Sequence, residues 1–261
     1  MYERIYSILS RGTEKKSNSE GYMWVGSEVC SQEYIIAPVA HSVHKLNEIS
    51  KGSLRCGTKN DINLIAFCRF ALMSNILLNT NKMLFNDKNF KVAIIGAGAV
   101  GITACFEFIR FGFKNVDIVY KGKHLNRVKI LSNEINRINL ENFDPKNYNI
   151  LIDATGNSNS IINIIQSALP YTKIFLLGVP FDDPNIGLLD FYRKNLTLIG
   201  CQELRISDQK RQELFLKLLN YYSSSNIDFF DYVQCHDYSE NTRKRLLNSD
   251  LTKPINIFKY R

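Results

Sequence analysis

The sequence predicts an α/β fold built around a doubly wound parallel sheet. The apolar, β-branched run 92–95 is followed directly by the glycine-rich segment 96–101. Apolar residues then recur at helical spacing, and a second strand-like run occupies 116–120. Further strand-like runs, which end near residues 153 and 178, alternate with helical segments. This order predicts a parallel sheet whose ligand lies beyond the carboxyl ends of its strands.

Composition limits the classes of protein to consider. The chain has 261 residues, of which 45% are hydrophobic and 22% charged, which suits one large or two modest globular domains. Neither a run of about 20 uncharged apolar residues nor the order of a secretory signal occurs. Six cysteines are scattered without a C-x-x-C pair. We therefore expect a cytoplasmic protein with no membrane partner.

The net charge of +8 permits an anionic partner. Basic residues are interleaved with acidic ones, apart from clusters at 121–129 and 243–245. No zinc finger, basic zipper or RNA-recognition pattern accompanies them. Most of this charge is therefore interpreted as solvated surface, and no nucleic-acid partner is predicted.

The glycine-rich segment has the G-x-G-x-x-G spacing of a dinucleotide-binding turn. Gly96 permits the tight turn, Gly98 lets the backbone approach a pyrophosphate, and Gly101 lets the helix pack closely on the strand. Ala99 and Val100, between these glycines, are also predicted to contact the dinucleotide. The alternative is a glycine-rich turn that binds nothing, but the surrounding strand, helix and strand favour a dinucleotide.

The end of the second strand predicts which dinucleotide is bound. NAD-binding proteins place a carboxylate there, but this chain has Tyr120 and Lys121, with Arg127 shortly after. A 2′-phosphate would meet a basic pocket, so NADP(H) is predicted. An ordinary exposed lysine-rich loop is the alternative. Four residues at later strand ends are predicted to line the ribose and nicotinamide: Thr155, Gly156, Gly178 and Val179.

Four segments together resemble one enzyme family: VAIIGAGAVG, ILIDATGN, FLLGVP and LLDFYRKNLTLIGCQ. In order and spacing they are similar to the cofactor domain of the medium-chain dehydrogenase/reductase superfamily, the zinc-type alcohol and polyol dehydrogenases. The resemblance implies a Rossmann domain and a small, truncated GroES-like β domain formed from the termini. The implied boundaries are 1–60 with 235–261 for the truncated catalytic domain, and 61–234 for the NADP-binding domain.

The same resemblance implies that the zinc ligands are missing. The segment RGTE stands where the family has its first catalytic cysteine, with Arg11 at that position. No Gly-His-Glu element occurs, and only residues 15–20 lie between RGTE and the next Gly-Tyr pair. No metal site is therefore predicted.

Without a metal ion, a reductase needs hydrogen-bond donors and a proton source. Thr13 matches the family position whose hydroxyl commonly begins a proton relay, and Tyr22 and His41 are further candidates. Structural roles remain open: Thr13 as a turn cap, Tyr22 as a packing residue and His41 as a surface histidine.

These features predict an NADP(H)-dependent, zinc-independent oxidoreductase that reduces a carbonyl or an activated C=C bond. The shortened catalytic domain would leave an open cleft for a small molecule or a bulky, peptide- or carrier-linked biosynthetic intermediate. A partner subunit would complete the cleft if the protein is a homodimer. The alternative is a catalytically inactive dinucleotide-binding protein that acts as an accessory subunit or redox sensor.

Overall fold

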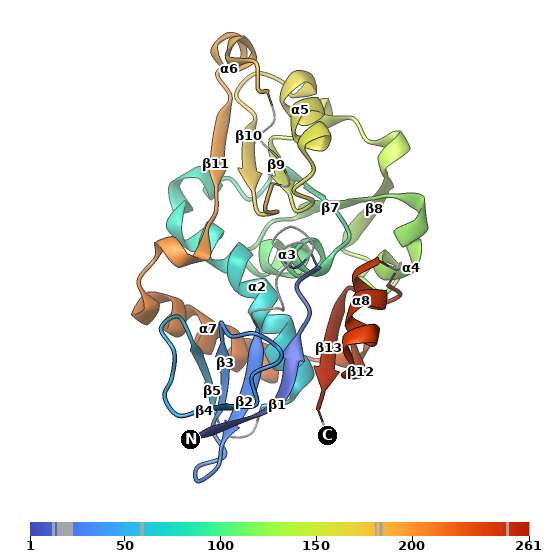
Figure 1. Cartoon of the computed structure of the whole chain (residues 1–261). Coiled ribbons are helices and arrows are strands. Elements are labelled where there is room, and N and C mark those ends of the chain that lie inside the picture. Colours follow the sequence, from blue (N-terminus) through green and yellow to red (C-terminus); the bar gives the residue numbers. More distant parts are fainter. Residues whose placement is uncertain are drawn as a thin grey trace. The chain divides into compact units, whose positions relative to one another are not determined.

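The computed structural model describes residues 1–11, 14, 23–57, 60–180, 182, 185–248 and 251–260 (Figure 1). The chain forms two compact units, which are described separately. The first unit contains residues 1–72 and 204–261, and the second contains residues 73–203. The helix α2 (Ile62–Thr80) begins in the first unit and ends in the second.

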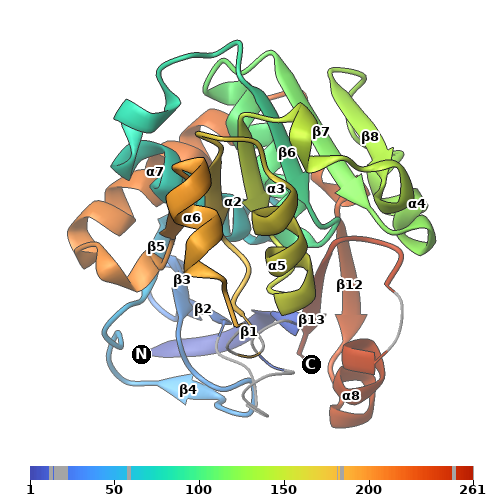
Figure 2. The ribbon, with the colours of Figure 1, turned by 90° about the horizontal axis from the view of Figure 1, so that it is seen from above.

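The second unit contains a six-stranded parallel sheet in the order β11-β10-β9-β6-β7-β8. From the central strand β6 the chain continues through β7 and β8 on one side, and it then returns to β9, β10 and β11 on the other. Figure 2 shows β6, β7 and β8 as neighbours. The strands are β6 (Lys91–Ile95), β7 (Asn115–Tyr120), β8 (Ile135–Asn139), β9 (Ile150–Asp153), β10 (Lys173–Leu176) and β11 (Thr197–Gly200).

The crossover helices α3 (Ala99–Arg110) and α5 (Ser158–Ser167) cover opposite faces of this sheet. Isoleucines of α5 pack in one cluster with Ile174 of β10. Phe108 of α3 contacts Phe85, which stacks on Phe175 at 4.8 Å between ring centres. Because successive strand residues point to opposite faces, Ile174 and Phe175 identify the two faces. The helix after β6 and the helix after β9 thus cover opposite faces of the sheet. In such sheets, ligands bind in the crevice between the two strands where this change of face occurs.

Shorter elements connect the strands of the second unit. The glycine loop and the helix α3 follow β6 directly, as the sequence predicts. The connecting elements are η1 (Lys82–Phe85), η2 (Gly122–His124), α4 (Leu125–Val128), η3 (Leu140–Asn142), η4 (Pro145–Asn147) and α6 (Leu188–Lys194).

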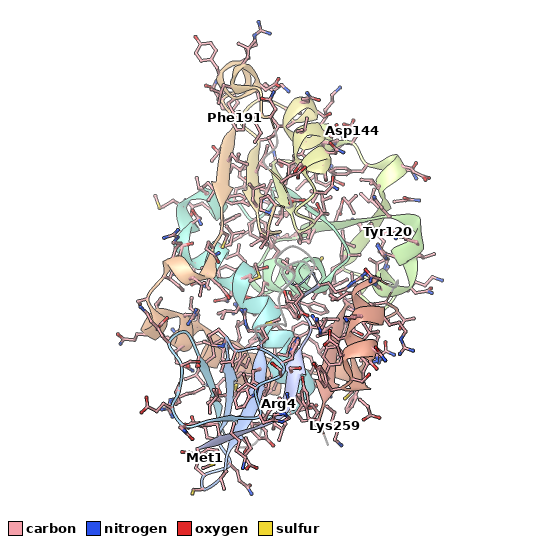
Figure 3. All side chains as sticks on the ribbon, in the orientation of Figure 1. Met1, Arg4, Tyr120, Asp144, Phe191 and Lys259 are labelled. Carbon is pink, nitrogen blue, oxygen red and sulfur yellow. The ribbon has the colours of Figure 1, made fainter. Side chains whose placement is uncertain are left out.

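The first unit is a sheet built from both ends of the chain. Its order is β12-β13-β1-β2-β3-β5, and β4 also pairs with β1. Ser7 of β1 lies opposite Phe258 of β13 in antiparallel register. Figure 3 labels Arg4 and Lys259 on these two neighbouring strands. The strands are β1 (Tyr2–Ile8), β2 (Trp24–Glu28), β3 (Tyr34–Ala37), β4 (Lys45–Leu46), β5 (Leu54–Gly57), β12 (Val233–Asp237) and β13 (Ile255–Lys259).

Besides the start of α2, the described part of the first unit contains the helices α7 (Asp208–Ser223) and α8 (Glu240–Asn248). It also has the short turns η5 (Glu203–Arg205), at the unit boundary, and η6 (Phe229–Asp231). The predicted fold class, a parallel α/β sheet with a smaller β domain from the termini, is confirmed. The units divide at 72/73 and 203/204, whereas the sequence-based boundaries were 60/61 and 234/235. The difference has a physical cause, because Phe67 of α2 contacts Tyr222 of α7 and Phe229 at 5.1 Å between ring centres.

The helix α2 is long and apolar. Among the described helices it alone has the length and hydropathy of a membrane-spanning segment. Its apolar window is 83% buried within the protein, which is the pattern of a core helix.

Candidate cofactor site

The loop after β6 has the backbone geometry that its glycines predict. Gly96 has φ +117°, and a Cβ atom on Gly101 would lie 1.8 Å from the Gly96 carbonyl oxygen. A side chain at position 101 would therefore separate α3 from the strand. Gly98 differs, because a Cβ atom there would meet no atom within 4 Å.

Gly98 is also the N-cap of α3, and no side chain caps this end of the helix. The open space at Gly98 thus lies at the start of a 12-residue helix whose N-terminus has no side-chain cap. This arrangement suits a phosphate group, because the helix dipole and the N–H groups both favour negative charge. The residues present therefore fit the pyrophosphate of a dinucleotide.

The loops after β9 and β10 contact each other and the glycine loop. A Cβ atom on Gly96 would lie 2.9 Å from Cγ2 of Thr155. Gly156 has φ +66°, and its added Cβ would lie 2.0 Å from the Val179 carbonyl oxygen. A Cβ atom on Gly178 would lie 2.3 Å from the Gly156 nitrogen. The structure thus brings together all four predicted residues of these later loops at the crevice between β6 and β9.

Asp153, which the sequence analysis did not select, holds the loop after β9 in place. This fully buried carboxylate accepts hydrogen bonds from Thr155 Oγ1 at 2.6 Å, Thr155 N at 3.2 Å and Gly156 N at 3.0 Å. Burial raises the pKa of the Asp153 carboxyl, and these hydrogen bonds oppose the rise. Its signal in the sequence is an acid at the end of the apolar run ILID.

We expect Asp153→Asn to lower the free energy of unfolding by about 2 kcal/mol. The NH₂ group of the asparagine side chain would face a backbone N–H donor of this loop, so one of the hydrogen bonds would be lost. Stability of the parent should also decline as the pH rises from the ordinary pKa of an aspartate through the raised pKa of Asp153. A carboxyl that binds its proton more tightly in the folded state has this effect. Urea denaturation across this acidic range checks both points. The same decline in the variant would show that another group causes it.

The residues of the predicted basic pocket at the end of β7 differ in their exposure to solvent. Tyr120, labelled in Figure 3, is half-buried, and Lys121 and Lys123 are exposed. Arg127 is buried on α4, with 6% of its surface exposed. Residues 120–129 contain no carboxylate. Lys121, directly after β7, therefore places an exposed cation at this strand end.

Of the three predicted catalytic residues, Thr13 and Tyr22 lie outside the described residues. His41 is fully buried in the first unit, so the alternative of a surface histidine is wrong. Its Nε2 lies 3.2 Å from Oε1 of Glu14, and its ring contacts Phe258 edge-on at 5.7 Å between ring centres.

Glu14 joins His41 to the helix α8. The other carboxylate oxygen of Glu14 accepts a hydrogen bond from Arg243 Nη1 at 3.2 Å. Hydrogen bonding to Glu240, and then to Glu14, raises the pKa of the Arg243 guanidinium. The sequence analysis did not select Glu14 or Arg243, because they are far apart in the chain. Within the described ranges, no three His, Cys, Asp or Glu side chains form a cluster that could hold a metal ion.

No family model matches the sequence, and no curated protein matches it. Solved structures of similar fold include TarJ from S. aureus in complex with NADPH (TM-score 0.73, 13% identity, 100% of this chain and 90% of that chain), YhdH from E. coli K-12 with bound NADPH (0.75, 13%, 99% and 90%) and galactitol-1-phosphate dehydrogenase from Escherichia coli (0.74, 12%, 99% and 91%). This chain shares both of its units with these structures, because the similarity covers almost its whole length.

Proposed function

We propose that this chain, which has the two-part fold of the medium-chain dehydrogenase/reductase proteins, is a cytoplasmic NADP(H)-dependent oxidoreductase. The observation that carries the proposal is the meeting of the loops after β6, β9 and β10 beside the open space at Gly98. Two structures of similar fold, TarJ and YhdH, were solved with NADPH. The cofactor supplies or accepts a hydride.

The chain's own residues then have separable roles. The N–H groups at the start of α3 hold the pyrophosphate, and the loops that contain Gly156 and Val179 line the ribose and nicotinamide. Lys121 holds the 2′-phosphate at the end of β7. The rigid contact between Gly156 and Val179 fixes the position of the nicotinamide-facing backbone, which favours hydride transfer in one geometry.

The cofactor preference tests the assignment of Lys121. We expect the parent protein to bind NADPH more tightly than NADH, and Lys121→Glu to weaken NADPH binding about tenfold or more while NADH binding changes little. Fluorescence titration with both cofactors measures this. Lys82→Glu, at an exposed lysine of η1, makes the same change in net charge and should leave the preference intact. Equal affinities of the parent for the two cofactors would contradict the assignment.

The proposed reaction is the zinc-independent reduction of a carbonyl or an activated C=C bond. Thr13 and Tyr22 are proposed as proton donors to the product oxygen or carbon. His41 is proposed to act only as a positioning residue, because it is enclosed by Glu14 and Phe258. The short connection between Glu14 and β2 favours a bulky, peptide- or carrier-linked biosynthetic substrate, with a homodimer partner completing the cleft.

Turnover tests the enzyme itself. NADPH oxidation should be detected with a panel of aldehydes, ketones and enones, including peptide- and carrier-linked ones. Thr13→Val and Tyr22→Phe should lower kcat more than they change NADPH affinity, since they remove proton donors and no cofactor contact. Tight NADPH binding without turnover across the panel would instead support an accessory or redox-sensing protein.

A further inference from the structure

A cavity of about 380 Å³ lies in the second unit at the amino ends of the parallel strands. The residues that line it lie directly before β6 and β9, and before and at the start of β10: Phe90, residues 146–149 and residues 169–173. The glycine loops follow the carboxyl ends of the same strands. The cavity is therefore separate from the proposed cofactor site, and its volume lies in the range of small-molecule pockets.

A strained tyrosine forms part of the cavity wall. Tyr171 has φ +65°, in the left-handed region that bulky side chains rarely adopt. It is the third residue of a turn in which Thr172 N donates to the Leu169 carbonyl at 3.3 Å and Pro170 is second. Turns of this kind favour glycine at the third position, and another residue there costs about 1–2 kcal/mol.

Packing within the chain does not explain why a tyrosine, and not a glycine, occupies position 171. Its side chain is exposed, since 74% of the residue is accessible to solvent. Its backbone N–H donates to the Lys194 carbonyl at 2.7 Å, a bond that glycine would make equally well. A strained residue whose ring is left exposed at the edge of a cavity indicates a binding role for that ring.

The other lining residues indicate the chemistry of the ligand. Phe90 and Tyr148 supply aromatic surface, and Lys146 and Lys173 are the charged residues among those that line the cavity, with no carboxylate among them. Lys173 Nζ lies 4.6 Å from the centre of the Phe90 ring and donates to the Leu84 carbonyl at 3.0 Å. The Lys146 backbone N–H donates to Asp144 Oδ1 at 3.0 Å, which fixes the start of η4; Figure 3 labels Asp144.

We propose that this cavity binds a small planar organic anion, an aromatic carboxylate or sulfonate. Tyr171 and Phe90 contact its flat apolar part, and Lys146 and Lys173 balance its charge. This site is independent of the proposed oxidoreductase function, because no residue is shared between the two.

The test uses 8-anilinonaphthalene-1-sulfonate, a fluorescent aromatic sulfonate, with the full chain in the presence and absence of saturating NADPH. We expect binding that NADPH does not displace. Tyr171→Gly and Lys146→Gln should each weaken it about five- to tenfold, through loss of a ring contact and of a counter-ion. Tyr192→Ala, which removes an exposed ring from α6, should leave the affinity unchanged.

The glycine variant also excludes misfolding as the cause of lost binding. Tyr171→Gly should keep or raise the melting temperature of the protein, because glycine adopts this φ without strain. Complete displacement of the dye by NADPH, or unchanged affinity in Tyr171→Gly, would overturn the proposal.

Discussion

Replacing Gly156 with alanine is expected to lower the free energy of unfolding by about 3 kcal/mol and to abolish NADPH binding. The added methyl group would lie 2.0 Å from the Val179 carbonyl oxygen, at a residue with φ +66°. Overpacking and an unfavourable backbone conformation each cost about 1–3 kcal/mol. The loops after β9 and β10 would have to separate, and these loops are proposed to line the nicotinamide. Urea denaturation and NADPH titration measure the two effects.

Gly98→Ala is the matched control for this experiment. Its added methyl group meets nothing within 4 Å, so we expect a change in stability of less than about 1 kcal/mol. NADPH affinity should nevertheless fall, because the methyl group occupies the space proposed for the pyrophosphate. The two variants therefore separate the packing of the loops from the fit of the cofactor. Parent-like stability of Gly156→Ala would show that the loops do not depend on this contact.

The second large effect is expected in the first unit, at Arg243. Arg243→Met should lower the free energy of unfolding by about 3 kcal/mol, because removing one partner of a buried ion pair leaves the other without its compensating charge. Glu14 is buried to 2% exposure. Its Oε1 would keep the hydrogen bond from Ser10 N at 3.0 Å and the contact with His41 Nε2 at 3.2 Å, but its Oε2 would lose the Arg243 guanidinium. Chemical denaturation near neutral pH measures this loss.

A double variant distinguishes lost charge compensation from lost packing. Glu14→Gln combined with Arg243→Met should recover much of the stability, since the buried charge is then removed together with its partner. Lys244→Met serves as the control, because Lys244 follows Arg243 on α8 and its side chain is exposed. It should change the free energy of unfolding by less than about 0.5 kcal/mol. If the double variant were no more stable than Arg243→Met, the charge on Glu14 would not be the cause.

Several parts of this molecule could be predicted from the sequence because their causes are local. The apolar run of β6, the glycine turn and the apolar stripe of α3 are contiguous, and each is confirmed as an element. The residues at the ends of β9 and β10 could be selected because strand ends are visible as breaks in apolar runs. That these ends meet at one edge follows from the parallel order of the strands.

Other features are consequences of contacts between distant segments. The family resemblance implied that residues 61–234, which include α7, belong with the parallel sheet, but the rings of Phe67 and Tyr222 pack together in the first unit. Arg127 was grouped with Lys121 because they are close in the chain, yet the structure buries one and exposes the other. The roles of Thr13 and Tyr22 stay predictions.

The sequence by itself determined the parallel sheet and its glycine loop, because periodicity and turn residues act over a few positions, whereas the joining of the two chain ends in one smaller domain was implied by the family resemblance. Only the tertiary structure decided how tightly the loops of Gly156 and Val179 meet, and that His41 is enclosed with Glu14 and Arg243. Glu14 and Arg243 are 229 positions apart in the chain, and no local sequence pattern indicates which buried charged side chains will form a pair.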